Sequence, residues 1–216
     1  MSKFIEKEMN CMMCGHVNTV TILTAATTEG SADLDSRPPE KRRSAMPLWV
    51  HQCEYCAAVF SVFEQTPKVE ESFLKTQKYV NCAGIAGLPE LAKSFVKIAL
   101  IYEQAAEMKK AGNYFLNAAW CCDDEKLDVN AKLCRDEALR CWNEVDVSEI
   151  NRRELPELQL KILDTLRRAE HYKEAKTFAK CIRTKDENMK QVIAFEISKS
   201  IEKDNDRYTL ADAIRR

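Results

Sequence analysis

Two pairs of cysteines near the amino terminus constrain this 216-residue chain more than any other feature. Cys11 and Cys14 are separated by two residues, and so are Cys53 and Cys56. A two-residue gap lets both thiolates of a pair reach one metal ion across a tight turn, and two such pairs complete a tetrahedral four-thiolate shell. The spacing predicts a Zn²⁺ site with these four ligands. A closed shell leaves no position for water or substrate, so the predicted metal is structural.

Composition and charge narrow the class of protein further. With 45% apolar and 31% charged residues, the chain can form one large or two smaller folded domains. It has no signal-peptide pattern and no apolar stretch of membrane-spanning length, so we expect a cytoplasmic protein without a membrane partner. Ten cysteines would also suit a secreted disulfide framework, but here metal binding and buried free thiols are favoured.

The two parts of the chain differ in pattern. β-Branched and aromatic residues lie near the cysteine pairs, at 17–23, 48–50 and 59–63, and predict short strands. Residues 25–45 form a long polar loop between the pairs. From Pro67 the apolar residues recur at helical spacing, with Thr66 as the expected N-cap and breaks at 81–87 and at Gly112-Asn113.

The predicted fold is therefore mainly α with a small β zinc ribbon. The ribbon covers residues 1–66, and residues 67–216 form an all-helical domain of the tetratricopeptide type, described as an irregular α-solenoid. The repeat character rests on Tyr172, Ala175 and Ala179, whose spacing lets two helices of a hairpin approach closely. Residues 113–120 show a weaker form of the same pattern, and the two stretches are not separated by a regular repeat length.

Three stretches of the amino-terminal part, with residues 113–120 of the tail, carry a family resemblance. They are Cys11-Met-Met-Cys14-Gly15, Ser31-Ala-Asp33-Leu-Asp35-Ser-Arg37-Pro38-Pro39 and Met46-Pro-Leu-Trp49-Val50-His-Gln52-Cys53-Glu-Tyr-Cys56. On these residues the chain resembles a bacterial family of unknown function that joins a four-cysteine zinc ribbon to a tetratricopeptide-like helical region. The sequence departs from the pattern of this family in two ways. Both Cys-x-x-Cys turns, called knuckles below, lack prolines, and Ala57 stands in place of a glycine. The resemblance implies a fold and a metal site and brings no reaction with it.

The loop residues Asp33, Asp35 and Arg37 are a candidate ligand- or partner-binding site. The carboxylates suit a cation or acid–base chemistry, and the guanidinium suits a phosphate or carboxylate. The same residues also suit a simpler role, in which they tie the long loop onto the ribbon or the helices. A small metal-dependent hydrolase would require Asp33 and Asp35 to converge with His51 around an open metal position.

Nucleic-acid binding is the other alternative, through a ribbon loop carrying Arg37, Arg42 and Arg43. The charge distribution does not favour it, because residues 1–66 carry six basic and eight acidic side chains and residues 67–216 carry 27 and 26. The favoured function is non-catalytic: a protein- or peptide-binding scaffold with a structural zinc, which also suits a homo-oligomer. Whether the protein has enzymatic activity is left open. Neither His16 nor His51 is expected to bind the metal, and the other six cysteines are expected to pack in the core.

Overall fold

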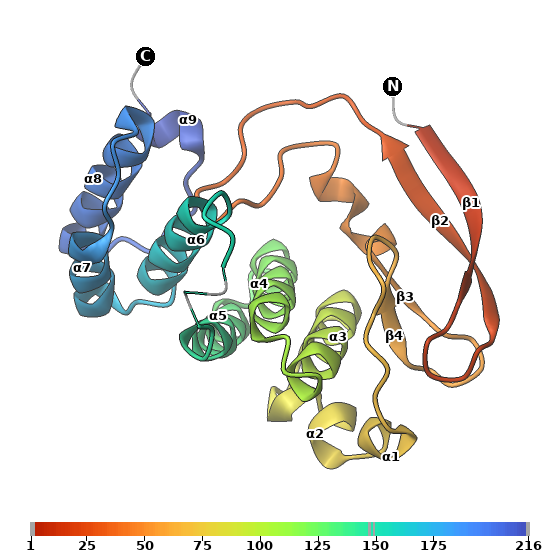
Figure 1. Ribbon diagram of the computed structural model, residues 1–216. Helices are drawn as coiled ribbons and strands as arrows, with labels where there is room; N and C mark the ends of the chain where they lie inside the picture. Colours follow the sequence, from red (N-terminus) through yellow and green to blue (C-terminus); the bar gives the residue numbers. More distant parts are fainter. Residues whose placement is uncertain (1–2, 147, 149, 215–216) are drawn as a thin grey trace. The chain divides into compact units, whose positions relative to one another are not determined.

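The computed structural model describes residues 3–146, 148 and 150–214 (Figure 1). The protein is mainly α, with small amino-terminal β-hairpins that bear the four cysteines. The strands are β1 (Lys3–Asn10), β2 (Val17–Ala25), β3 (Val50–Gln52) and β4 (Val59–Ser61). The α-helices are α1 (Glu71–Leu74), α2 (Gln77–Val80), α3 (Glu90–Gln104), α4 (Met108–Asp124), α5 (Asp128–Asn143), α6 (Leu155–Arg168), α7 (Tyr172–Cys181), α8 (Glu187–Glu202) and α9 (Leu210–Ala213). The chain also forms the short 3₁₀ turns η1 (Arg43–Leu48) and η2 (Cys82–Gly84). No described helix is both long and apolar enough to cross a bilayer.

The chain divides into two compact units that do not follow the order of the sequence. Unit 1 contains Met1–Thr28 and Glu40–Glu144, and unit 2 contains Glu29–Pro39 and Val145–Arg216. Helices α1 to α5 therefore group with the hairpins, and part of the inter-knuckle loop groups with helices α6 to α9. The boundary predicted after residue 66 stays a prediction about which segments fold independently.

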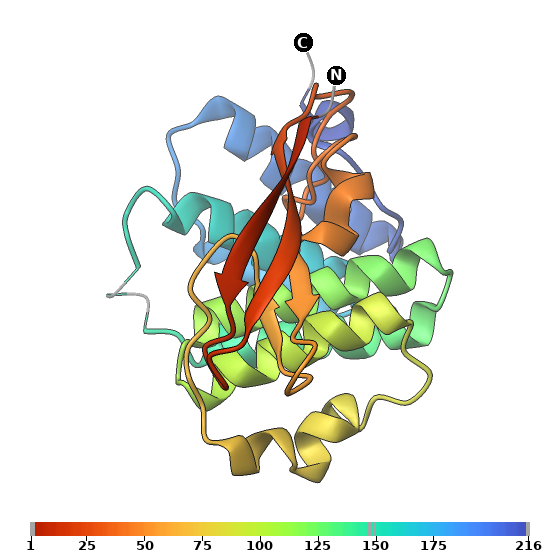
Figure 2. The same ribbon diagram turned by 90° about the vertical axis from the view of Figure 1, so that its right-hand side faces the viewer.

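Two antiparallel hairpins carry the cysteine pairs in unit 1 (Figure 2). In the longer hairpin Ile5 pairs with Ile22 and Lys7 with Val20, so alternate side chains of β2 point toward the interior. Val20 is buried there in a cluster with Cys11, Cys53 and other ribbon residues. The strands predicted near 17–23 and 59–63 are confirmed as β2 and β4, whereas β1 was not predicted because its charged residues obscure the alternation.

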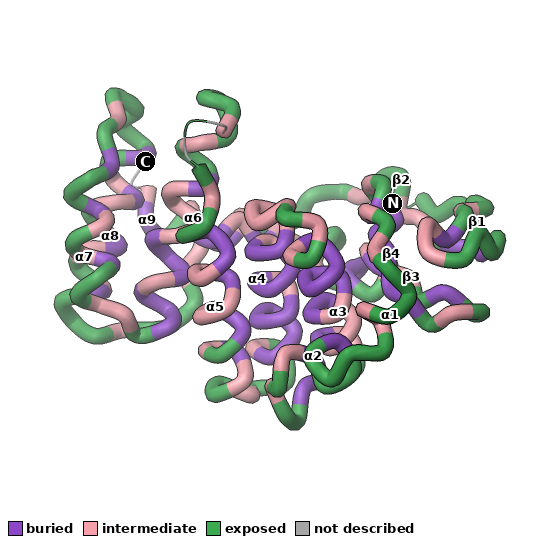
Figure 3. Tube along the Cα trace, turned by 60° about the horizontal axis from the view of Figure 1, so that its bottom comes forward, coloured by how far each residue is buried: buried purple, intermediate pink, exposed green. Residues whose placement is uncertain are grey.

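Helices α3, α4 and α5 supply most of the buried side chains of unit 1. Figure 3 shows buried residues along α3 and α4, and Phe95, Ile98 and Phe115 are completely shielded from solvent. The short hairpin β3–β4 packs against α3, where the Trp49 and Phe95 rings lie 6.5 Å apart edge to face. The hydroxyl of Tyr114, which lies in α4, donates a hydrogen bond of 3.0 Å to the Glu64 carboxylate. The helices thus have an apolar core of their own, and aromatic and polar contacts attach the ribbon to it.

Three helix connections use the same tight turn without glycine. At α3–α4, α4–α5 and α6–α7 the residue in the left-handed region is Ala106, Lys126 and Glu170, with φ between 57° and 65°. In each turn the next N–H donates to a carbonyl five residues earlier, as from Leu127 to Cys122 at 2.9 Å. This is the Schellman arrangement, in which glycine is usual because a Cβ atom is strained at positive φ. The turns allow antiparallel helices to follow one another closely.

Two sequence-based helix boundaries are wrong. Gly112 was expected to end a helix but lies inside α4. A glycine is needed there because the indole of Trp142 from α5 occupies the space that a Cβ would fill, with its Nε1 only 2.4 Å from that position. Thr66 was expected to cap a helix beginning at Pro67. Its hydroxyl instead accepts from the Ser61 amide at 2.9 Å, and α1 begins at Glu71. Gly112 thus serves a tertiary contact, and Thr66 serves a local turn contact in place of a helix cap.

Unit 2 has two small apolar clusters. One joins α6, α7 and α8 around Leu163, Ala175 and Ala179. The other contains Leu34, Val192 and Ala213, so a residue of the inter-knuckle loop packs with α8 and α9. The carboxy-terminal region is therefore helical as predicted, but its core includes a residue from the amino-terminal sequence.

Replacing Lys126 by glycine is expected to stabilise unit 1. Lys126 is exposed and has φ of 57°, so removing its Cβ relieves strain of about 1 kcal/mol. The measurement is the urea midpoint of unfolding, followed by tryptophan fluorescence, because all three tryptophans lie in unit 1. Lys126→Ala is the matched control, since it removes the same charge and keeps the Cβ; an equal gain in both variants would contradict the strain explanation.

Candidate metal centre

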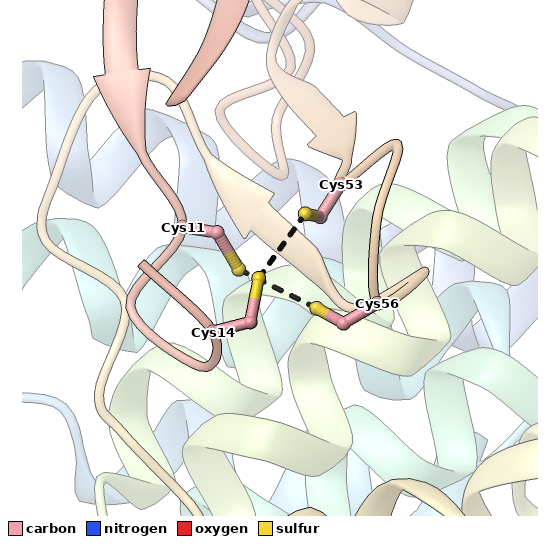
Figure 4. A group of neighbouring side chains, drawn as sticks. All are labelled: Cys11, Cys14, Cys53 and Cys56. Atoms are coloured by element: carbon pink, nitrogen blue, oxygen red, sulfur yellow. Dashed lines mark hydrogen bonds between the residues drawn. The ribbon is translucent and has the colours of Figure 1, made fainter. Parts of the chain in front are cut away.

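The four predicted cysteine ligands converge on one point (Figure 4). Cys11 Sγ lies 3.6 Å from Cys56 Sγ, and Cys14 Sγ lies 3.7 Å from Cys53 Sγ. All four sulfurs lie within 4.8 Å of one another. Four sulfurs bound at ~2.3 Å around one tetrahedral ion would be separated by about 3.8 Å. The cluster therefore has the dimensions and the donor set of a structural zinc site.

The two knuckles have matching backbone geometry. The Cys11 amide donates to the His16 carbonyl and the Cys53 amide to the Ala58 carbonyl, both at 2.8 Å. Each turn contains one residue at positive φ, Gly15 at 78° and Ala57 at 57°. Ala57 therefore adopts a strained conformation at the position where the resembling family has a glycine. Both pairs of thiols still reach the same point.

Asn18 is a site residue that the sequence analysis missed. It is buried in β2, and its side-chain amide donates to the His16 carbonyl at 3.0 Å and to Cys53 Sγ at 3.7 Å. Its Oδ1 accepts from the Glu54 amide at 3.1 Å. One side chain thus bridges the two knuckles and contacts a ligand sulfur. The available signal was a polar residue at an inward position of β2, where Val20 and Ile22 follow at alternate positions.

The thiols of the cluster have unequal affinities for protons. Burial raises the pKa of Cys11, and burial together with the neighbouring sulfurs raises that of Cys56. Burial also opposes ionisation of Cys53, but the N–H groups of Cys56 and Tyr55 and the Cys14 thiol bring its pKa down to about 6. Four sulfurs this close cannot all ionise without a counter-charge. A divalent cation would supply that charge, so the crowding of the four thiols is a physical reason to expect a metal at this position.

The neighbouring histidines lie outside the group of four ligands. His16 is exposed, and its ring stacks on exposed Tyr55 of the other knuckle with centroids 5.8 Å apart. His51 lies in β3 against Phe60, at 5.2 Å between centroids, and burial lowers its pKa. Of the six remaining cysteines, all but Cys181 are buried; they are Cys82, Cys121, Cys122, Cys134 and Cys141.

The candidate loop residues Asp33, Asp35 and Arg37 lie in unit 2, where each is at most 1% exposed. The loop backbone pairs with the segment before α9, because the Leu34 amide donates to Tyr208 at 3.0 Å and the Leu210 amide donates to Ala32 at 2.8 Å. Asp35 accepts from Arg168 of α6 at 3.3 Å. The geometry matches the simpler of the two roles given above, attachment of the loop to the helices. Binding of a ligand or partner by these residues stays a prediction.

A second group of buried charges surrounds Arg167, which the sequence analysis did not single out. Its guanidinium donates to Asp164 at 2.6 Å and to Glu196 of α8 at 2.7 Å. It also donates to the carbonyls of Asp204 at 3.0 Å and Asp206 at 2.8 Å. Burial raises the pKa of Asp164, and the nearby Asp35 carboxylate adds to the effect. Burial together with the nearby Asp164 carboxyl raises the pKa of Glu196 strongly. One guanidinium therefore serves two carboxyl groups that do not readily ionise together.

The fold and the site define a mainly helical protein with a four-cysteine metal centre formed by amino-terminal β-hairpins. No protein-family model matches the chain, and it has no match among curated proteins or solved structures. The family resemblance described above therefore stays a prediction. The metal centre stands on its own geometry.

Replacing Asn18 by alanine is expected to weaken zinc binding by about 10- to 100-fold, because the knuckles lose their shared hydrogen-bond partner and Cys53 loses a donor. A competition titration against a chromophoric chelator measures the change. Thr19→Ala, an exposed neighbour on the same strand, is the control. Equal affinity in the two variants would contradict a role for Asn18 in holding the site.

Unit 2 is expected to lose stability as pH rises above about 4, where the carboxyl groups of the unfolded chain ionise. Asp164 and Glu196 have raised pKa values, so the folded state keeps protons that the unfolded chain releases, and the free energy of unfolding falls with pH. Glu196→Gln should flatten this dependence. Urea titrations at each pH, followed by amide resonances of α6 to α8, measure it, with the exposed Glu187→Gln as control. A slope unchanged by Glu196→Gln would contradict the assignment.

Proposed function

We propose that this protein is a non-catalytic scaffold that binds a protein or peptide partner and whose amino-terminal ribbon is held by a structural Zn²⁺. The observation that carries the structural role is the closed four-thiolate cluster, in which the chain supplies all four tetrahedral positions. A metal with this donor set would hold the ribbon together and leave no open position for a substrate. Cys11, Cys14, Cys53 and Cys56 are the ligands.

The helical region supports the binding part of the proposal. Successive antiparallel helices joined by the same left-handed turn, as at Ala106 and Lys126, form extended surfaces in helical-repeat proteins. We propose a tetratricopeptide-like character for this region, on the close packing of Ala175 and Ala179 predicted from the sequence and seen in the α6–α8 cluster. This step is an analogy of fold and identifies no partner.

No observation favours either alternative function. Arg37 is buried, so a nucleic-acid interface of the predicted loop would rely on Arg42 and Arg43. For the hydrolase, Asp33 and Asp35 belong to unit 2 and His51 to unit 1, so neither unit by itself brings the three together. Asp35 is moreover engaged by Arg168.

Freshly purified protein should contain one zinc per chain by elemental analysis. Chelation, or Cys14→Ser or Cys53→Ser, should unfold the hairpins, because a structural zinc contributes on the order of 10 kcal/mol to folding. Most of the helical circular dichroism should remain, since α3 to α5 have a core of their own. Cys181→Ser is the matched control, because Cys181 is exposed and outside the cluster. Metal-free protein with intact hairpins would contradict a structural zinc.

The scaffold itself is tested by affinity capture from a native lysate with the wild-type, Cys14→Ser and Cys181→Ser proteins. Partners retained by all three proteins bind the helices, and partners lost only with Cys14→Ser require the ribbon. If no protein is captured above the level of an empty resin by any of the three, the proposed scaffold function is wrong.

A further inference from the structure

Unit 2 carries an open groove of about 270 Å³ along its last two long helices. The groove is lined by residues that directly follow α7 and by residues of α8. Its walls are Ile182, Arg183, Thr184, Lys190, Ile193, Ala194 and Ile197. A space of this size accepts one or two aliphatic side chains from outside.

The apolar wall of the groove continues onto the surface of α8. Ile193 and Ile197 form the edge of the α6–α8 cluster and are only partly buried by it. Ile201 follows one turn later on the same face and is 65% exposed. The last helices of a stacked array normally present a polar outer face to water. Apolar residues at four-residue spacing along α8 instead match the face of another helix laid beside it.

The charged residues that line the groove are both basic. The Arg183 guanidinium donates to the backbone carbonyls of Lys180 and Ile182, which leaves its positive charge uncompensated by these contacts. Lys190 pairs with Glu187 at 2.7 Å, but both side chains are well exposed, so the pair is weak and easily exchanged. The groove therefore combines an apolar floor with two basic side chains at its rim, one of them in an exposed ion pair.

We propose that this groove binds an amphipathic helix of a partner protein, with aliphatic residues at i and i+4 and carboxylates beside them. The aliphatic side chains enter between Ile193 and Ile197 and extend toward Ile201. The carboxylates pair with Arg183 and Lys190. This inference rests on the proposed scaffold function and assigns to it a site and a class of partner.

The test uses the full-length zinc-loaded protein and two synthetic helical peptides of about 18 residues. Both are alanine-based with leucines at i and i+4; one has glutamates beside the leucines and the other has lysines in their place. Fluorescence anisotropy should show the acidic peptide binding at least about tenfold more tightly at low salt, and added salt should reduce the difference because the rim charges are exposed.

Two sets of variants separate the floor of the groove from its rim. Ala194→Gln fills the groove without a charge at an exposed helical position, and it should weaken the acidic peptide at least about tenfold. Ala211→Gln, exposed on α9 outside the groove, is the matched control and should bind like wild type. Arg183→Gln combined with Lys190→Gln should leave the two peptides bound about equally.

Equal binding of the two peptides by wild type, or binding unaffected by Ala194→Gln, would overturn the proposal. A dimer in light scattering that Ala194→Gln dissociates would also overturn it, because a second copy would then cover the groove. If wild type and Ala194→Gln captured the same partners from lysate, the proposed groove site would be wrong, whereas the scaffold function would be supported. Absence of any captured partner would count against the scaffold function, while the peptide result would still decide the groove.

Discussion

The convergence of two distant cysteine pairs on one point is the constraint on which the amino-terminal half depends. The chain between Cys14 and Cys53 must return to its starting point, so residues 15–52 form a loop that a metal held by the four thiols would close. Closing such a loop costs conformational entropy that a two-stranded hairpin with a thin core cannot offset by itself. The free energy of metal binding would offset it, and the small Val20 and Phe60 cluster packs around the cysteines.

The same loop also belongs to unit 2. Residues 29–39 leave unit 1 and return to it, so the two units are connected covalently at 28–29, at 39–40 and at 144–145. Within unit 2, Leu34 enters an apolar cluster and Asp35 meets Arg168. A helical region that starts at residue 67 would lack these contacts, and the buried Arg168 would lose its ion pair with Asp35, which is costly. The segment therefore completes the core of unit 2.

The sequence predicted the parts of this structure that depend on local pattern or fixed spacing. The four ligands, the strands β2 and β4 and the helical character after the ribbon follow from residues close together in the chain. What it did not predict depends on neighbours from elsewhere in the fold. Gly112 continues a helix because Trp142 needs its space, and Asn18 bridges two knuckles that only the fold brings together. Lys126 turns the chain without glycine because the helices on either side hold it there.

The buried charges of unit 2 explain why polar loop residues were hard to assign from sequence. Asp33, Asp35 and Arg37 look like a surface loop, since isolated charges are rarely buried. They are buried here because α6 brings Arg168 to Asp35 and because backbone pairing with residues 208–210 fixes the segment. Burying an ion pair adds little net stability, but it penalises every arrangement that leaves one charge alone. The charges therefore select one register for the loop.

Metal binding and loop docking consequently act on the same stretch of chain. A bound ion would hold the two ends of residues 15–52 together in unit 1, and the contacts of Leu34 and Asp35 fix the middle in unit 2. Loss of the ion would release these two ends from each other and lengthen the loop that docking must close. The entropic cost of a loop grows by only about 0.6 kcal/mol for each doubling of its length. The loop should therefore stay docked when the ribbon melts, and the metal should control the hairpins far more strongly than it controls the helices.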